Sequence, residues 1–381
     1  MAKKHVNITQ VCSEIFAGGD APKDRMSTQP TPEYKVPVYS NGEDNDGLYG
    51  YTDFARVTSP SITVSARGTI GYTSIRNEPF VPIVRLITIT PIPEIVDIRY
   101  LYYVIKNYNF KGSGTSIPQL TVPMLKTYKF PLPSLDEQRS IAAVLDKVSG
   151  LIAKRREQLD KLDELVKARF VEMFGEPVSN PHQYPIRQLS EYIEFLTSGS
   201  RGWSQYFSDD GEYFITIKNV KNCSISLEDV QYIKPPDNAE AVRTKVKDGD
   251  LLISITADLG RTGVVTKEIA DHGAYINQHL TCIRLNREKL NPLYVAYYME
   301  SPAGKMQFNA KNQAGVKAGL NFNAINSLKL VVPPLEKQGL FVGFVSQTDK
   351  SKLTIQQSLG KLEVLKKTLM QQYFGLGGDL L

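Results

Sequence analysis

The chain has 381 residues, 41% of them hydrophobic and 22% charged, so it has room for two or three globular domains. The formal net charge is +5, but residues 1–130 hold 14 Lys and Arg against 11 Asp and Glu, and residues 176–330 hold 17 against 17. A nucleic-acid partner is thus permitted only through a local patch, and the absence of a secretion signal or membrane-length apolar run argues against a membrane partner.

Residues 1–130 are predicted to form a globular domain of short strands and loops. Alternating β-branched residues predict strands at Ile62–Ala66 and Val84–Ile89, with a turn at Asn41-Gly42. The segment Tyr100–Ile105 has an ambiguous period, and we interpret it as a helix with an apolar face.

Residues 131–175 are predicted to form one long amphipathic helix. Ser134 and Glu137 have the spacing of a capping box at its start. A helix of roughly 37 residues is about 55 Å long, which is too long to pack inside a small domain. Apolar residues recur at three- and four-residue steps on one stripe: Ile141, Val144, Leu145, Val148, Leu151, Ile152, Leu159, Leu162, Leu165, Val166, Phe170 and Met173.

Residues 176–330 begin with a Pro- and Asn-rich linker and then repeat the first pattern in outline. Leu251–Ile255 parallels the strand predicted at Ile62–Ala66, and Leu293–Tyr298 parallels the tyrosine-rich helix. We therefore expect a second globular domain of the same kind.

Residues 331–381 hold a second long helix and a C-terminal tail. Pro333–Gly375 repeats Pro133–Gly175 at an offset of 200 residues without a gap, including the Phe-Gly end. The second copy is the poorer helix sequence, because Gly360 lies inside it at a cost of about 1 kcal/mol relative to alanine, and Ser346, Lys352 and Lys366 interrupt its apolar seam.

Two matched helices with heptad-like stripes most simply bury those stripes on each other. The predicted fold class is α+β, with two pseudo-repeated globular domains separated by two long helices that pair as an antiparallel coiled coil. The alternative is that each helix is a core helix of its own domain. The residues expected in the coiled coil are Leu145, Val148, Ile152, Leu159, Leu162, Phe341, Val345, Ile355, Leu359, Leu362 and Leu369.

The sequence offers almost no catalytic signal. Asn291–Tyr294 resembles the Asn-Pro-Pro-Tyr tetrad of adenine methyltransferases, but the third position differs and no glycine-rich cofactor loop follows an early strand, so we interpret it as a helix start. The histidines lack metal-ligand spacing, so neither a metal nor a cofactor is expected. The three widely spaced cysteines, at positions 12, 223 and 282, indicate reduced thiols and a cytoplasmic location.

Several loops combine glycine with side chains that can read DNA. Asn and Gln pair bidentately with adenine and Arg with guanine, while Ser and Thr reach base edges or phosphates. Trp203, the only tryptophan, either stacks on a base or caps the domain core, and His279 either satisfies the backbone or meets a ligand. The candidate DNA-binding residues are Lys23, Arg25, Asn41, Arg67, Thr69, Lys111, Ser113, Thr115, Ser116, Ser198, Ser200, Arg201, Trp203, Arg261, Asn277, Gln278, Lys311 and Gln313.

The two helix entries, Pro-Ser-Leu-Asp-Glu-Gln at Pro133–Gln138 and Pro-Pro-Leu-Glu-Lys-Gln at Pro333–Gln338, together with Gly-Asp-Leu-Leu-Ile-Ser at Gly249–Ser254, carry a resemblance to a known family. In this order of domains, the chain resembles the specificity subunit of type I restriction–modification systems along essentially its whole length. It departs from the pattern where Gly339 stands at the position of Arg139.

The resemblance implies that each globular domain reads one half of a split, asymmetric site in double-stranded DNA. The paired helices would set the spacing of the half-sites and bind two methyltransferase subunits, with restriction subunits around that core. The chain itself would have no catalytic activity. A single-chain methyltransferase or nuclease, and a coiled-coil adaptor that does not read DNA, are the competing hypotheses.

Overall fold

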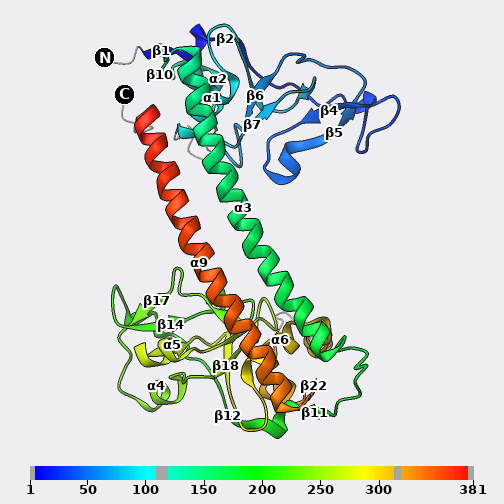
Figure 1. Cartoon of the computed structure of the whole chain (residues 1–381), viewed down its shortest axis with the longest axis vertical. Helices are drawn as coiled ribbons and strands as arrows, with labels where there is room; N and C mark the ends of the chain where they lie inside the picture. The colour runs from blue at the N-terminus through cyan, green and yellow to red at the C-terminus, as the bar shows by residue number, and fades with distance from the viewer. Residues whose placement is uncertain (1–4, 109–118, 313–318, 376–381) are drawn as a thin grey trace. The chain divides into compact units, whose positions relative to one another are not determined.

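The computed structural model describes residues 5–108, 119–312 and 319–375, which divide into two compact units (Figure 1). Unit 1 comprises Met1–Glu157 and Gln356–Leu381, and unit 2 comprises Gln158–Ile355. Both long helices, α3 (Leu135–Phe174) and α9 (Leu335–Phe374), therefore contribute one segment to each unit.

Unit 1 is built on a four-stranded antiparallel sheet of order β2-β9-β6-β7, beside a second sheet of order β3-β5-β4-β8 in which β4 and β8 run parallel. A short pair, β1-β10, lies where the chain enters and leaves the domain. The strands are β1 (His5–Asn7), β2 (Cys12–Ala17), β3 (Met26–Ser27), β4 (Val36–Tyr39), β5 (Leu48–Thr52), β6 (Ser61–Val64), β7 (Thr73–Arg76), β8 (Val81–Pro82), β9 (Ile87–Pro91) and β10 (Lys129–Pro131), and the helices are α1 (Ile98–Asn107) and α2 (Val122–Lys126).

Unit 2 repeats this topology, with sheets of order β12-β21-β18-β19 and β13-β17-β14-β20 and the pair β11-β22. Its strands are β11 (Ile186–Gln188), β12 (Ile193–Ser198), β13 (Phe207–Ser208), β14 (Glu212–Ile215), β15 (Val220–Lys221), β16 (Ser224–Ile225), β17 (Gln231–Ile233), β18 (Leu251–Ser254), β19 (Thr262–Val264), β20 (Ala274–Ile276), β21 (Leu280–Leu285) and β22 (Lys329–Val331). Its helices, besides the long ones, are α4 (Ala239–Thr244), α5 (Lys267–His272), α6 (Pro292–Glu300), α7 (Pro302–Lys311) and α8 (Phe322–Asn326). Among the described residues, the second half thus repeats the order of both four-stranded sheets and adds α4, α5, α7 and the strand pair β15-β16.

One predicted strand begins later than its composition suggested. The sequence predicts a strand over Val84–Ile89, but β9 begins at Ile87. Arg85 has a φ of 67°, a left-handed conformation that a strand does not accommodate, so the chain turns before it pairs. The helix predicted around Tyr100 is present as α1, and Asn291 caps α6 by accepting a hydrogen bond from the Leu293 N–H at 2.9 Å.

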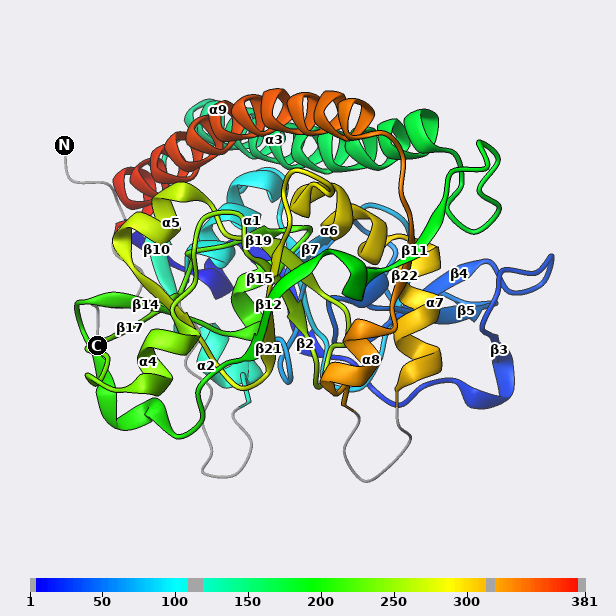
Figure 2. The same cartoon turned by 90° about the horizontal axis from the view of Figure 1, so that it is seen from below.

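The two long helices run antiparallel within each unit, where Figures 1 and 2 show them side by side. In unit 1, Arg156 of α3 pairs with Glu363 of α9 at 2.8 Å. In unit 2, Lys352 of α9 pairs with Asp163 of α3 at 2.6 Å, and Phe174 lies against Phe341 with ring centroids 5.7 Å apart. Later residues of one helix therefore meet earlier residues of the other.

The Phe-Gly end of each helix packs on a buried tyrosine of a globular domain. Phe374 of α9 lies against Tyr100 of α1 in unit 1, and Phe174 of α3 lies against Tyr294 of α6 in unit 2. Both tyrosines are fully buried, and their hydroxyls donate to the backbone oxygens of β10 and β22. Each long helix thus starts beside one domain and ends in the core of the other unit.

Burial along the helices follows a narrow heptad seam. Leu145, Val148 and Ile152 are buried in unit 1, and Phe341 and Val345 are buried in unit 2. Five further seam residues are partly buried: Leu159, Leu162, Ile355, Leu359 and Leu362. Leu369 packs against the unit 1 core.

Three residues assigned to the same stripe from their spacing lie outside the seam. Val144, Leu151 and Leu165 are 38%, 39% and 49% exposed. A coiled-coil seam admits two positions in every seven, so a third apolar row falls on its flank.

Candidate nucleic-acid interface

In both units a glycine lies where the end of a first-sheet strand crosses a second-sheet strand. A side chain at Gly18 would overlap the backbone of Pro82, and one at Gly199 would overlap the backbone of Ile276 and Asn277. This close approach requires glycine, and it fixes the same backbone crossing beside β8 and beside β20.

Each crossing supports a tight connection between the two sheets, here called the first tip (residues 83–86) and the second tip (residues 277–280). In the first tip the Val84 N–H donates to the Gly19 carbonyl at 2.7 Å, and in the second the Gln278 N–H donates to the Ser200 carbonyl at 3.0 Å. Within each tip the fourth residue's N–H donates to the first residue's carbonyl, as Leu280 does to Asn277. The two tips are therefore equivalent, and position 84 corresponds to position 278.

The first tip borders a hollow of about 830 Å³ in unit 1. Tyr49 and Val84, which are 52% and 49% exposed, line it together with the basic residues Lys23 and Arg25. Asp20 and Asp24 also line the hollow, so its charges are mixed, and the exposed Tyr49 and Val84 are the side chains that suit contact with bases.

Arg25 is held against an acidic and an aromatic neighbour. Its guanidinium donates to Asp53 Oδ2 at 2.5 Å and lies 5.2 Å from the centre of the Phe54 ring. The hydrogen bond from Arg25 lowers the pKa of Asp53. The arginine is thus oriented but partly neutralised.

The loop after β6 lies beside the first tip and is braced to it by Asn41. The Asn41 amide accepts from the Ala66 N–H at 2.9 Å and donates to the Val84 carbonyl at 2.7 Å. Its side chain therefore supports the loops rather than facing a partner. Arg67 and Thr69, in the braced loop, are exposed.

The second tip carries a different brace. His279 Nδ1 lies 2.6 Å from Thr256 Oγ1, in the loop after β18, and His279 Nε2 lies 3.1 Å from the Gln278 side-chain nitrogen. The Asn277 side chain accepts from the His279 N–H at 3.2 Å. The structure therefore brings two predicted residues, Asn277 and Gln278, to one edge with a histidine.

The loop after β12 divides into buried and exposed residues. Ser200 is fully buried beside Thr244, with their hydroxyl oxygens 3.0 Å apart, and Trp203 is 4% exposed and donates to Glu240 Oε2 at 3.1 Å. Trp203 thus caps a small core in this structure, and neither it nor Ser200 presents its side chain at the surface. Arg201 is exposed.

Ser198 is partly exposed at the end of β12. The Arg243 guanidinium of α4 donates to the Ser198 carbonyl at 2.9 Å, which adds a positive charge at this edge.

The remaining candidates are not part of one cluster. Arg261 pairs with Asp258 three residues before it, and Lys311 donates to Ser327 Oγ at 2.7 Å. Five candidates lie outside the described residues: Lys111, Ser113, Thr115, Ser116 and Gln313.

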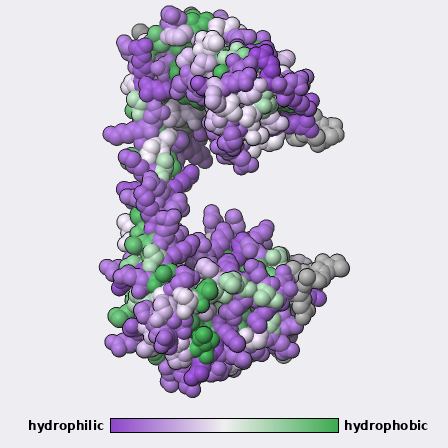
Figure 3. Space-filling model, turned by 90° about the vertical axis from the view of Figure 1, so that its right-hand side faces the viewer, coloured by the Kyte–Doolittle hydropathy of each residue, from purple (hydrophilic) through white to green (hydrophobic). Residues whose placement is uncertain are grey.

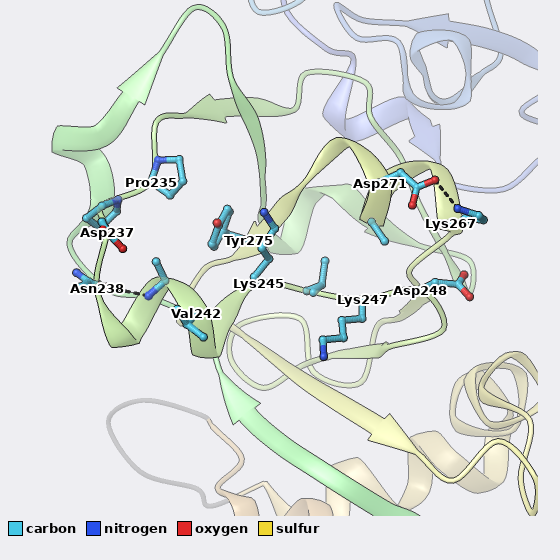
Figure 4. Close-up of a pocket in the computed structure, with 14 residues that line it drawn as sticks. Pro235, Asp237, Asn238, Val242, Lys245, Lys247, Asp248, Lys267, Asp271 and Tyr275 are labelled. Carbon is cyan, nitrogen blue, oxygen red and sulfur yellow. Dashed lines mark hydrogen bonds and ion pairs between the residues drawn. The ribbon is translucent and has the colours of Figure 1, made fainter.

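A second hollow, of about 790 Å³, lies in unit 2 between residues of α4 and residues of α5 (Figure 4). Lys245 lies beside Tyr275, with its ammonium 5.6 Å from the ring centre, and a hydrogen bond to Glu212 raises the pKa of Lys245. Lys267 pairs with Asp271 at 2.6 Å. Asp237, Asp248 and Asp271 line the hollow beside Lys245, Lys247 and Lys267, so its charges balance.

Five residues at these edges escaped the sequence analysis. Val84 and Arg85 were assigned to a strand, Tyr49 was not singled out although Gly47 and Gly50 flank it, Arg243 lies away from glycine-rich loops, and Thr256 carried no local signal. Arg85 instead extends from the first tip and donates to Gln119 Oε1 at 3.1 Å. Only the backbone crossing that makes the two tips equivalent reveals these positions.

The described surface is largely hydrophilic on the face that Figure 3 shows. Within the described residues, no group of three His, Cys, Asp or Glu side chains could hold a metal ion. No helix in the same residues is long and apolar enough to cross a membrane.

The repeated domains match a family model twice. The model for the type I restriction modification DNA specificity domain matches residues 3–163 and again residues 194–367. The chain belongs to this family. The resemblance seen in the sequence is therefore confirmed.

Relatives in this family include specificity subunits from bacteria and archaea. A putative type I specificity subunit of Mycoplasma pneumoniae is 35% identical over 164 residues, covering 43% of this chain and 48% of its own. The MjaVIII specificity subunit of Methanocaldococcus jannaschii is 22% identical over 295 residues, covering 73% and 69%. The chain thus spans about half the length of its Mycoplasma pneumoniae relative.

A solved structure confirms the predicted α+β fold class. The type I restriction–modification S subunit from M. genitalium superposes with a TM-score of 0.57, covering 99% of this chain and 96% of the other at 17% sequence identity. At this identity the likeness shows the fold of two repeated domains with long helices.

Proposed function

We propose that this specificity subunit reads a split, asymmetric target in double-stranded DNA, with one half-site for each globular domain. The observation that supports this most directly is the pair of equivalent tips. One backbone frame is built twice, and at corresponding positions it presents Val84 and Arg85 in one unit and Gln278 and His279 in the other. Two tips that share a backbone arrangement but carry different side chains suit the reading of two different base sequences.

The same proposal assigns salt-dependent affinity to the basic residues around the tips. Lys23 and Arg25 lie beside the first tip, and Arg243 lies beside the second. Each cation that neutralises a phosphate releases counterions, so binding weakens as salt rises. Because neither half is strongly basic overall, the phosphate contacts are few and local.

The proposal also assigns the chemistry to partners. Two methyltransferase subunits would bind along the paired helices, where Leu340, Leu353 and Val364 are 63%, 56% and 67% exposed, and restriction subunits would join that complex in the cytoplasm. These side chains are separated along α9, so the assignment of the methyltransferase subunits to the helices follows the family resemblance. The chain would then act without catalytic residues or a cofactor of its own.

Mapping of adenine methylation tests this function. Genomic DNA from cells that contain the chain and its methyltransferase is compared with DNA from cells that lack only the chain. We expect one bipartite motif to lose methylation entirely. An unchanged methylation pattern, with the methyltransferase demonstrably expressed, would instead favour an adaptor that does not read DNA.

A further inference from the structure

We propose that Gln278 is the base-discriminating residue of the second tip, where its side-chain amide pairs with an adenine in the major groove. His279 and Thr256 act as positioning residues that hold this amide. The inference rests on the proposed function and adds to it a residue, a base and a means of orientation.

The first step is the position of Gln278 on the frame. Its backbone N–H is held by the Ser200 carbonyl at 3.0 Å, and the crossing beneath it is fixed by Gly199, which leaves no room for a side chain. The backbone of the tip is thus anchored to two sheets. A side chain on such an anchored backbone can keep the precise geometry that base recognition needs.

The second step is the orientation of the amide. The Gln278 side-chain nitrogen lies 3.1 Å from His279 Nε2, and His279 Nδ1 lies 2.6 Å from Thr256 Oγ1. A neutral imidazole satisfies both contacts by accepting the amide hydrogen at Nε2 and donating its own hydrogen from Nδ1 to the hydroxyl. In this tautomer, the order Thr256, His279, Gln278 orients the amide with its nitrogen towards the imidazole ring.

The third step concerns the hydrogen-bonding groups of the Gln278 amide that His279 does not use. A primary amide has two N–H hydrogens and one carbonyl oxygen, and His279 accepts one of those hydrogens. One N–H and the Gln278 oxygen remain. They match adenine, which offers a donor at N6 and an acceptor at N7 in the major groove, whereas guanine offers two acceptors there.

The equivalent position in unit 1 cannot make this contact. Val84 carries no hydrogen-bonding group, and its tip is braced instead by the Asn41 amide, which bonds to backbone on both sides. An exposed valine favours an apolar contact such as the thymine methyl group. The two half-sites should therefore differ at the base that meets this position.

The test uses variants of the full chain in complex with its methyltransferase, with the methylated motif mapped for each. Gln278→Ala should relax the requirement for adenine at a single position of the second half-site. The preference for adenine over the other bases there should fall by roughly 5- to 150-fold, the equivalent of about 1–3 kcal/mol per bidentate contact. Gln278→Glu has nearly the same volume but only acceptor groups, so preference at that base should shift towards cytosine. Glu288→Ala, beyond the opposite end of β21, is the matched control and should leave the motif intact.

The positioning role has its own readout. Thr256→Val removes the hydroxyl but keeps the shape, and it should weaken discrimination at the same base as Gln278→Ala. Thr256→Ser restores the hydroxyl and should restore discrimination. A merely structural role for Thr256 would instead lower methylation of the whole motif without changing the preference for any single base.

The outcomes separate this inference from the proposed function. If loss of the chain abolishes a bipartite motif but Gln278→Ala and Gln278→Glu both leave the second half-site unchanged, the assignment of Gln278 is wrong and the function stands. If loss of the chain changes no motif, the proposed function itself fails. Should Gln278→Ala fold poorly, the near-isosteric Gln278→Glu decides the assignment through its expected shift to cytosine.

Discussion

At the scale of single residues, the recurring glutamine of the helix entries has a clear physical role. Gln338 is fully buried; its oxygen accepts from the Asn291 N–H at 2.9 Å, and its nitrogen donates to the Pro333 carbonyl at 2.8 Å. Gln138 makes the corresponding contacts with Asp97 and Pro133 in unit 1. Each glutamine thus ties the start of a long helix to the start of a domain helix.

Replacing this glutamine should destabilise the protein. Gln338→Leu would leave a buried N–H and a buried carbonyl without partners, at a cost of about 1–3 kcal/mol for each such group. Urea unfolding of the full chain measures the loss. Gln347→Leu, the same change at an exposed site on α9, should stay within about 0.5 kcal/mol, and equal losses in the two variants would contradict the role of the buried contacts.

At the scale of elements, the helix pairing is interrupted by charge. In unit 1, burial together with Lys106 and Arg156 lowers the pKa of Lys366. In unit 2, Lys352 at the seam pairs with Asp163 and Asp349. Lys352 thus has carboxylate partners, whereas Lys366 lies near two further cations, and both lysines interrupt the apolar seam of the second helix.

Removing the Lys366 charge should therefore stabilise unit 1. Lys366→Met keeps an unbranched side chain and should raise the free energy of unfolding, by less than about 1 kcal/mol because solvent screens this half-buried position. A lowered folded pKa means that the penalty is present at neutral pH and disappears as pH rises through that pKa, so the gain should shrink in alkaline solution. Thermal unfolding at neutral pH and in alkaline solution measures the gain in stability, with the exposed Lys367→Met as control. An equal gain in the control, or a loss of stability in Lys366→Met, would contradict this role of Lys366.

The elements also show where prediction from sequence succeeds. The helices repeat without a gap because their seam and their entry contacts restrict the same positions in both copies, so α3 and α9 could be found by simple comparison. The tips could not, because Val84 and Gln278 are not separated by the offset of 200 residues that relates the helices. The second half has six more residues than the first between its tip and its long helix, in the stretch that holds α7, and the equivalence of the tips survives only in backbone hydrogen bonds.

Side-chain environment was equally hidden from the sequence. Asn41, Ser200 and Trp203 have the composition of DNA-reading loops, yet the fold uses the first as a brace and buries the other two. Whether a polar residue faces solvent or backbone depends on contacts far along the chain, such as Trp203 with Glu240. Local composition does not contain that information.

At the scale of the whole molecule, the account holds that one chain carries two independent DNA readers on a repeated frame. The topology supports this, because each globular domain has its own sheets and its own core cluster. A reader with its own core should keep its specificity when it is moved as a unit. Specificity should therefore follow the domain and not the helices.

The most direct test is a domain exchange followed by methylation mapping. Residues 1–130 are replaced by the corresponding domain of another specificity subunit of this family, and the hybrid is expressed with the original methyltransferase. We expect one half of the bipartite motif to change and the other half to be retained. Loss of both halves from an assembled and active complex, or an unchanged motif, would contradict the claim that each domain reads its own half-site.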